Sequence, residues 1–130
     1  MSSDRLRMTF PLYAGIAAGA SEVWDQVVSI PNGESGVVTK ARFMPATAVT
    51  AHDSNYADLS IEINTTEIAS EQTTTGDTGD LTAGTEIELA LSGSLEVSDG
   101  DRLSVKKTHA GTGAVLDGYV TVDIQLFRAA

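Results

Sequence analysis

The chain has 130 residues and no cysteine, so it has room for one domain, and disulfide frameworks and thiolate metal sites are excluded. Hydrophobic residues make up 42% of it, which excludes a chain that is disordered throughout. The formal net charge is −10, and the stretch from Phe43 to Asp101 holds twelve acidic residues and no Lys or Arg, a composition that repels nucleic acids and anionic membranes.

The first half of the chain predicts four strands. Its apolar and polar residues alternate with a period of two, which places successive side chains on opposite faces of a sheet. Pro11 cannot donate to a strand ladder, so the first strand lies at a sheet edge or is broken there. Pro31-Asn32-Gly33 predicts a turn before the third strand. The predicted strands are Leu6–Tyr13, Glu22–Ile30, Gly36–Met44 and Ala57–Asn64.

The sequence predicts only some of the side chains that these strands bury. In the second strand, Trp24, Val28 and Ile30 are available to the core. For the third strand, the alternation is compatible with burying either face, and it does not decide which one. Its two possible inward-facing sets are Val37, Ala41 and Phe43, or Val38 and Met44.

The second half predicts a short edge strand after Thr65, followed by a mobile loop over Glu71–Asp80, because Thr, Gly and Asp are abundant there. Asp99-Gly100 predicts a turn. The remaining predicted strands are Thr85–Leu91, Leu95–Val97, Asp101–Lys107 and Tyr119–Phe127, the last being the clearest because Val120, Val122, Ile124 and Leu126 alternate with polar residues.

About eight strands, with turn signals every 8–12 residues, predict an all-β fold, an antiparallel β-sandwich. Long connections favour a jelly-roll-like order over an immunoglobulin-like one. Residues 1–20 are interpreted as an N-terminal arm or first strand with a small-residue connector, and residues 21–130 as a single β-sandwich domain. The sequence contains no run of about 20 apolar residues, so it predicts no membrane-spanning helix. The early apolar stretch is interrupted by Thr9, Pro11 and Tyr13, so it is interpreted as a strand and not as a signal peptide.

Two short segments have the residue types of enzyme sites. His52-Asp53-Ser54 resembles the composition of a hydrolytic triad, but triads assemble from distant segments, and adjacent loop residues rarely face one another. Gly111-Thr112-Gly113 has a phosphate-loop spacing, but position 116 is Leu116 and no helix follows. We therefore predict no enzyme activity and no cofactor, and interpret His52 and His109 as surface-loop residues.

Metal and glycan sites are weighed against ordinary structural roles. Asp-rich turns can supply oxygen ligands to calcium, but the twelve-residue calcium-loop pattern is absent, so no metal site is predicted. Sugars stack on exposed aromatic rings, for which Tyr56 and Tyr119 are the candidates. The other large aromatic side chains are expected in the core or at an interface. The acidic turn residues are Asp77, Asp80, Asp99 and Asp101, and the expected core or interface aromatics are Phe10, Tyr13, Trp24 and Phe43.

The N-terminal segment is the candidate for partner contact, because free termini fray unless something holds them. Its simplest role is a strand within its own sheet. The alternative is an arm that pairs with a neighbouring protein, since strand addition to an exposed edge is a common mode of association. The predicted partner-contact residues are Arg5, Leu6, Arg7, Phe10 and Trp24.

The stretch from Leu95 to Leu126 combines a GDRLSV strand, a glycine-rich loop and a closing GYVTV strand. This texture resembles the small jelly-roll proteins of tailed bacteriophages that decorate, or cement, the capsid. The resemblance covers about a third of the chain and includes no catalytic motif. Abundant Thr and Ser, the absence of cysteine and the acidic composition fit the same group.

The resemblance implies a non-enzymatic structural virion protein. Such proteins are assembled in the host cytoplasm and bind the capsid exterior, usually as homotrimers, where they bridge subunits of the major capsid protein. Nucleic acid and membrane are not expected partners. The alternatives are a tail- or fibre-associated structural protein and, from a different class, a carbohydrate-binding or adhesin β-sandwich module.

Overall fold

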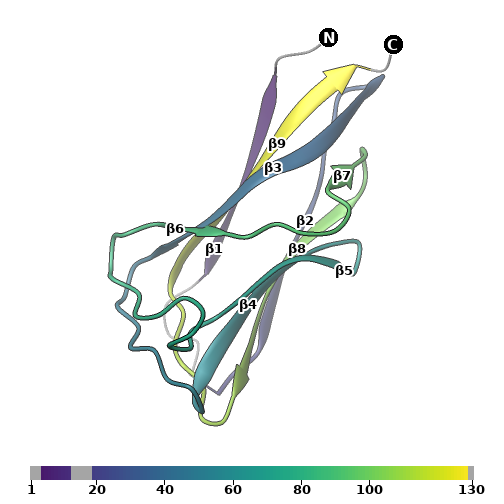
Figure 1. The fold of residues 1–130 in the computed structure, drawn as a ribbon. Helices are drawn as coiled ribbons and strands as arrows, with labels where there is room; N and C mark the ends of the chain where they lie inside the picture. The colour runs from purple at the N-terminus through teal and green to yellow at the C-terminus, as the bar shows by residue number, and fades with distance from the viewer. Residues whose placement is uncertain (1–3, 13–18, 129–130) are drawn as a thin grey trace.

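The computed structural model describes residues 4–12 and 19–128 of the chain. Within these ranges nine strands form two antiparallel sheets, and no helix is present (Figure 1). The predicted all-β sandwich is therefore confirmed. None of the described residues forms a helix long and apolar enough to cross a membrane. The strands are β1 (Arg5–Leu12), β2 (Glu22–Val27), β3 (Glu34–Pro45), β4 (Tyr56–Ile63), β5 (Thr66–Gln72), β6 (Ile87–Leu89), β7 (Glu96–Val97), β8 (Arg102–Ala110) and β9 (Gly118–Arg128).

The strand order is nested. Sheet A runs β1-β9-β3-β6, with β7 also paired to β3, and sheet B runs β2-β8-β4-β5. The first strand therefore pairs with the last, the second with the second-to-last, and β4 with β5 as the innermost hairpin. This is the order of a jelly roll, in which connections pass repeatedly from one sheet to the other. The edge position that Pro11 predicts for β1 is confirmed, since β9 is the neighbour of β1 within sheet A.

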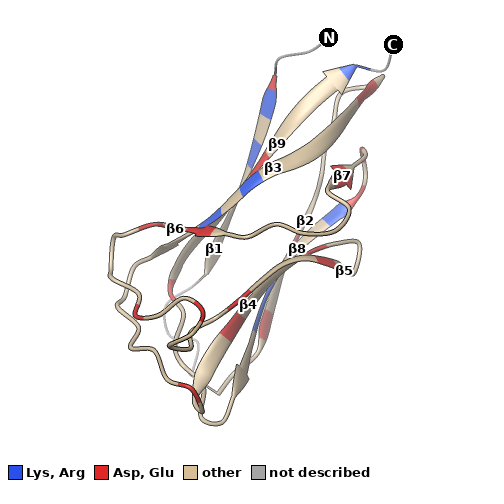
Figure 2. Cartoon of the chain, viewed as in Figure 1, with Lys and Arg blue, Asp and Glu red and all other residues tan. Residues whose placement is uncertain are grey.

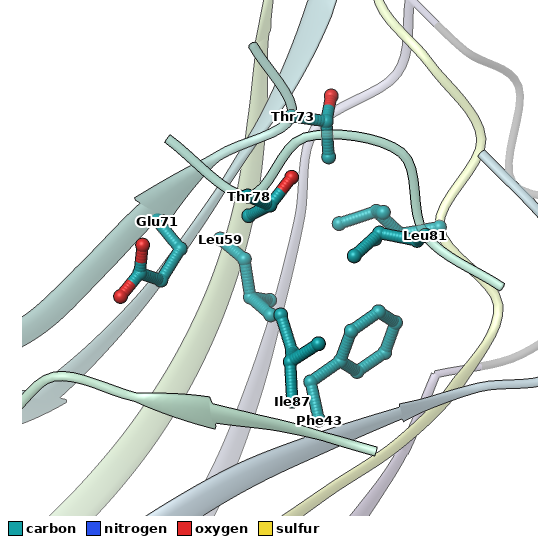
Figure 3. Close-up of a pocket in the computed structure, with 8 residues that line it drawn as sticks. Phe43, Leu59, Glu71, Thr73, Thr78, Leu81 and Ile87 are labelled. Atoms are coloured by element: carbon teal, nitrogen blue, oxygen red, sulfur yellow. The ribbon is translucent and has the colours of Figure 1, made fainter. Parts of the chain in front are cut away.

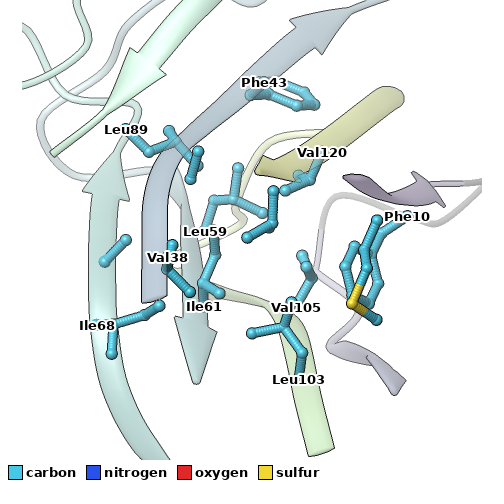
Figure 4. Packing of buried hydrophobic residues seen from close by; sticks show 14 of the residues in the cluster. Phe10, Val38, Phe43, Leu59, Ile61, Ile68, Leu89, Leu103, Val105 and Val120 are labelled. Carbon is cyan, nitrogen blue, oxygen red and sulfur yellow. The ribbon is translucent and has the colours of Figure 1, made fainter. Parts of the chain in front are cut away.

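The core lies between the two sheets and follows the predicted alternation (Figure 4). Phe10 and Phe43 are fully buried from sheet A, and Ile61 and Leu103 are fully buried from sheet B. All four apolar residues of the last predicted strand, Val120 to Leu126 at alternate positions, are buried as well. Burying such side chains contributes about 1.5–3 kcal/mol each, so this layer accounts for most of the stabilisation.

A β-bulge determines which side chains of β3 face the core. The register of β3 against β9 shifts between Val38 and Lys40. Val38 is buried before the bulge, and Ala41 and Phe43 are buried after it. Each of the two predicted inward-facing sets is therefore right only in part: Val37 is not buried in the first set, and Met44 is not buried in the second. An extra residue in one strand reverses the side-chain parity, and a fixed period of two cannot anticipate that reversal.

Several boundaries differ from the predicted ones. β2 ends at Val27, although Val28 and Ile30 beyond it are buried as expected. β6 covers only Ile87–Leu89 within the predicted Thr85–Leu91 strand, because the chain then leaves β3 and bridges to β5. β8 extends to Ala110, three residues past its predicted end. The interpretation of His109 as a loop residue is therefore wrong, because it lies exposed on β8. The predicted Tyr13 and most of the small-residue connector lie outside the described residues.

Candidate functional site

The two flanks of the sandwich are built differently. On the closed flank, formed by β5 and the segment from β6 to β7, the chain joins the two sheets with main-chain contacts (Figure 1). The Ser92 amide donates to the Ile68 carbonyl at 2.8 Å, and Leu91 forms an isolated bridge with Ala69. The Val38 amide also donates to the Leu95 carbonyl at 2.8 Å, so the segment that bridges to β5 returns to β3. On this flank the edges of the two sheets are therefore joined to each other through the segment from β6 to β7.

On the opposite side, the open flank, the edge strands β1 and β2 have no strand outside them within the described residues. One side-chain hydrogen bond spans the two edges, in which Gln26 Nε2 donates to the Thr9 carbonyl at 2.8 Å. A strand edge of this kind presents main-chain donors and acceptors that can pair with another chain. The open flank is therefore the candidate functional site.

The backbone of β1 points alternately toward β9 and toward the open flank. The Leu126 amide donates to the Asp4 carbonyl at 2.9 Å, so the even-numbered residues of β1 face β9. Arg5, Arg7 and Thr9 consequently direct their main-chain groups outward. This edge is partly protected, because Gln26 occupies the Thr9 carbonyl and Pro11 has no amide hydrogen to offer.

The backbone of β2 alternates in the same way. The Val28 amide donates to the Asp101 carbonyl at 2.7 Å, so Trp24 and Gln26 belong to the set that bonds β8. Val23, Asp25 and Val27 therefore direct their main-chain groups away from β8. Their side chains lie on the outer face of sheet B, and the two valines are 51% and 69% exposed. No proline interrupts this edge.

The outer face of sheet A carries half of the basic residues of the chain. Arg5 and Arg7 lie on β1, and Lys40 and Arg42 lie on β3, visible as blue segments on these strands in Figure 2. Most acidic residues are distributed elsewhere over loops and sheet B. The same face also carries the acidic residues Asp123 and Glu88, and Arg42 pairs with Glu86, so basic and acidic side chains are mixed there. This face adjoins the open flank at β1.

Asp123 on β9 is the centre of an ion-pair network on this face. Arg7 Nε lies 2.8 Å from Asp123 Oδ1, and Arg42 Nη2 lies 2.5 Å from Asp123 Oδ2. Arg42 also approaches Glu86 at 3.5 Å. The hydrogen bond from Arg7 is the main cause that lowers the pKa of Asp123, with Arg42 adding to it, and Asp123 in turn raises the pKa of Arg7. The network ties β1, β9 and β3 together.

The predicted partner-contact residues are placed in different environments. Arg5 is exposed and makes no ion pair with any described residue, whereas Arg7 is held by Asp123. Leu6 and Trp24 are half-buried against the core. Phe10 is fully buried between the sheets, so its ring is not presented to a partner. β1 pairs with β9 along its whole length, which makes residues 5–12 a strand of the sandwich.

Sequence reasoning missed Val23 and Val27. The signal was available, because a strand that turns Trp24 toward the core must turn its odd-numbered neighbours outward. The role of Gln26 had no comparable signal, since the partner of its side chain is set by the packing of two separate sheets.

The candidate enzyme motifs serve structural roles. His52 Nδ1 accepts hydrogen bonds from the Ser54 and Asn55 amides at 3.0 and 2.8 Å, which closes the loop tip on itself. Asp53 accepts from the Thr75 amide at 2.9 Å and is not paired with His52. Hydrogen bonds from Thr75 are the main cause that lowers the pKa of Asp53. In the glycine-rich loop, the Thr112 amide donates to Asn55 Oδ1 at 2.9 Å.

The acidic turn residues also accept main-chain hydrogen bonds. Asp77 and Asp101 close their own turns, whereas Asp80 and Asp99 tie their loops to distant segments. The loop over Glu71–Asp80, for which the sequence predicts mobility, is held by two of these bonds. Among the described residues, no group of three His, Asp or Glu side chains could hold a metal ion. The bonds run from the Gln72 amide to Asp77 at 2.8 Å, from the Ala51 amide to Asp80 at 2.8 Å, from the Ile30 amide to Asp99 at 2.9 Å and from the Ser98 amide to Asp101 at 2.8 Å.

The candidate sugar-stacking rings do not share a groove. Tyr119 is 53% exposed on the outer face of sheet A, and Tyr56 lies at the start of β4 on the outer face of sheet B. The sandwich separates the two rings, so they cannot stack on one ligand.

The enclosed space between the sheets is small. A cavity near the closed flank, seen in Figure 3, holds about 10 Å³, which is room for about one water molecule. A shallow hollow of about 400 Å³ lies beside β6, around Thr39 and Leu91, and is open to solvent. The residues that line the small cavity are Phe43, Leu59, Glu71, Thr73, Thr78, Leu81, Ile87 and Leu116.

No family model matches the chain, and no curated protein matches it. Among solved structures it is similar to dimeric latent PorU from Porphyromonas gingivalis, with 17% sequence identity over 93% of this chain and a TM-score of 0.44. The chain spans 12% of the length of that PorU chain. A likeness at this level carries no argument about function.

Proposed function

We propose that the chain is a structural protein of a tailed-bacteriophage virion, one that decorates the outside of the capsid and stabilises it by bridging subunits of the major capsid protein. The observation that carries this proposal is the open flank, where two strand edges are left available on one side of an otherwise closed sandwich. The texture of the stretch from Leu95 to Leu126 supplies the resemblance to capsid decoration proteins.

Two further features support a binding role. His52 and the aspartates that suggested catalysis or metal binding accept hydrogen bonds that hold loops together. The cavity between the sheets has room for about one water molecule, which is too little for a metabolite. The molecule therefore offers its surface, and above all its strand edges, as the means of recognition.

The mechanism is binding linkage. A protein that binds only the expanded lattice stabilises that state by mass action, in proportion to how far its concentration exceeds its dissociation constant. A homotrimer would multiply weak contacts through avidity. The exposed basic residues of sheet A, Arg5 and Lys40, would meet an acidic surface of the shell, and the acidic residues of the loops and of sheet B would face solvent on the capsid exterior.

Co-sedimentation with expanded capsids of the phage that encodes the chain tests this proposal. We expect the protein to pellet with expanded capsids at a fixed copy number and to stay in the supernatant with unexpanded shells. Protein that stays in the supernatant with both would contradict the proposal, and so would a monomer that binds sugar at one of its faces.

A charge reversal locates the contact. Arg5→Glu is the cleanest variant, because Arg5 is exposed and removing it leaves the Arg7–Asp123 pair in place. We expect weaker capsid binding and an unchanged melting temperature. Arg102→Glu is the matched control, since Arg102 is also exposed but lies on sheet B. Equal binding by the two variants would remove the β1 edge from the mechanism.

A further inference from the structure

The two edges of the open flank are not equivalent. β1 has its outward carbonyl at Thr9 occupied, lacks a donor at Pro11 and carries two arginines, which are the usual protections of an edge strand. β2 has no proline and no capped outward carbonyl among the described residues, and the charge on its outward-facing set is that of Asp25. Its outward main-chain groups lie at Val23, Asp25 and Val27, and no proline or side-chain cap covers them among the described residues.

The side chains along β2 form a short pattern of their own. Val23 and Val27 are exposed on either side of Asp25, at alternate positions on the outer face of sheet B. The hydroxyl of Ser104, on the neighbouring strand β8, donates to Asp25 and fixes the direction of its carboxylate. The outward side chains of this edge are therefore apolar at Val23, acidic at Asp25 and apolar at Val27, and Ser104 holds the acid in place.

We propose that β2 is a strand-addition site for an extended segment of another protein, in which a basic residue stands between two apolar residues at alternate positions. The basic side chain would lie opposite Asp25, and the apolar ones would cover Val23 and Val27. Main-chain hydrogen bonds to the three outward residues would supply affinity, and the side-chain pattern would supply specificity. Charge complementarity to Asp25 selects this occupant.

A second copy of β2 is a poor occupant of the same edge. Antiparallel pairing that uses all three outward residues places Val23 opposite Val27 of the second copy and Asp25 opposite its own counterpart. Like charges directly opposite one another destabilise a strand pair. Asp25 therefore acts against self-pairing while it favours a basic partner.

The inference rests on the proposed function for the existence of a protein partner, but the edge can be tested by itself. The probe is a seven-residue peptide with valine at its second and sixth positions, lysine at its fourth and threonine elsewhere. Titration of this peptide into the isotope-labelled chain should shift the amide signals of Val23, Asp25 and Val27. Replacing the lysine by glutamate should weaken binding about fivefold, as expected for one cross-strand charge pair.

Two variants and one modified peptide sharpen the test. Asp25→Lys should reverse the preference, so that the glutamate peptide binds more tightly. Val27→Pro removes an outward amide and leaves the hydrogen bonds to β8 in place. It should weaken the binding of both peptides and leave the melting temperature nearly unchanged. A lysine peptide N-methylated along its pairing edge should not bind, and this control leaves the protein intact.

Several results would overturn the inference. These are no shift at β2 with millimolar peptide, shifts confined to sheet A or to loops, equal affinity for the two charges, and self-association through β2. Lost peptide discrimination with capsid binding intact would remove the β2 site and leave the proposed function. If the chain still distinguishes the two peptides but does not bind capsids, the β2 site stands and the proposed function is wrong.

Discussion

The closed and open flanks of this sandwich solve the same problem in opposite ways. A sheet edge exposes unpaired main-chain groups, and a protein must cover them, protect them or use them. On the closed flank the chain pairs with β3 as β6, bridges to β5 at Leu91 and pairs with β3 again as β7, which joins the edges of the two sheets. On the open flank, the Gln26 side chain alone spans β1 and β2 among the described residues.

The difference shows where the fold separates stability from recognition. Residues on the closed flank are enclosed by both sheets, so changes there act on the whole molecule. The outward residues of the open flank contact little of their own chain, so changes there leave the fold in place and alter what can pair with it. Truncations on the closed flank should therefore lower the free energy of unfolding more than truncations on the open flank.

Truncating Ile68 should be the most costly change. Ile68 is fully buried on β5, and its carbonyl accepts the Ser92 amide that seals the closed flank. Ile68→Ala should lower the free energy of unfolding by about 2–5 kcal/mol, the range for a cavity left in a packed core. Urea unfolding monitored by the Trp24 fluorescence measures it.

Val27→Ala is the matched truncation on the open flank, because Val27 is 69% exposed. Its free energy of unfolding should stay within about 0.5 kcal/mol of the parent chain. If both truncations cost the same, the two flanks do not differ in the way the structure indicates.

Asp123→Asn comes second, because it removes the charge that joins β1 to β3 across β9. We expect a loss of about 1–2 kcal/mol at neutral pH, because the carboxylate pairs with both Arg7 and Arg42. The loss stays in this modest range because Arg7 is 62% exposed and solvent screens its charge. Glu88→Gln is the control on the same face, because Glu88 is exposed and makes no ion pair with a described residue.

The pH dependence of this loss has a definite sign. The pKa of Asp123 is lowered in the folded chain, mainly by the hydrogen bond from Arg7. The stabilisation is therefore fully present above the ordinary pKa of an aspartate, about 3.9, and disappears as the pH falls through the lowered value. Unfolding curves of the parent chain and Asp123→Asn should converge at acidic pH. A difference that persists at acidic pH would mean that the carboxylate charge is not the cause.

The sequence predicted the strands well and their interruptions poorly. The alternation from Val120 to Leu126 is local information, and β9 follows it. The bulge after Val38 and the early end of β6 depend on contacts with other strands, so no local period contains them. The turn between β4 and β5 is a similar case. Asn64 and Thr65 adopt φ angles of 54° and 103°, a conformation that a β-branched threonine disfavours.

The candidate site was predictable in part for the same reason. The sequence predicts Arg5 and Arg7 as contact residues because they lie in the N-terminal segment, and free termini fray unless something holds them. The structure places both arginines on β1, which is an edge strand. Phe10 was chosen as an aromatic contact residue, but period two places it on the same face as Met8 and therefore in the core. That β1 and β2 share one flank follows from the nested strand order, which spacing along the chain does not reveal.

Gln26→Ala should have a smaller and local effect, because it removes the side-chain hydrogen bond between the two open edges. We expect a loss of about 0.5–1 kcal/mol. Hydrogen exchange should quicken for the β1 amides that pair with β9, with little change on β5. Gln125→Ala is the control, since Gln125 Nε2 donates to the Asp4 carbonyl at 3.0 Å within sheet A. Faster exchange on β5 in Gln26→Ala would show that the flanks are coupled.

Glu71→Gln should have the smallest effect, and it should raise stability. Glu71 lines the small cavity on the closed flank and accepts the Ala90 amide at 3.1 Å (Figure 3). Burial is the main cause that raises its pKa, and Asp77 adds to it. A raised pKa means that ionisation costs stability as the pH rises through the folded value. A glutamine keeps the oxygen that accepts from Ala90 and carries no charge.

At neutral pH, Glu71→Gln should gain about 0.5 kcal/mol or less, and the gain should vanish below the ordinary pKa of a glutamate. Unfolding curves recorded at neutral and at acidic pH measure both parts of the prediction. A loss of stability at neutral pH would show that the carboxylate itself holds the closed flank. The bond between Gln26 and Thr9 contains no titrating group, so its contribution to stability should not change over the same pH range.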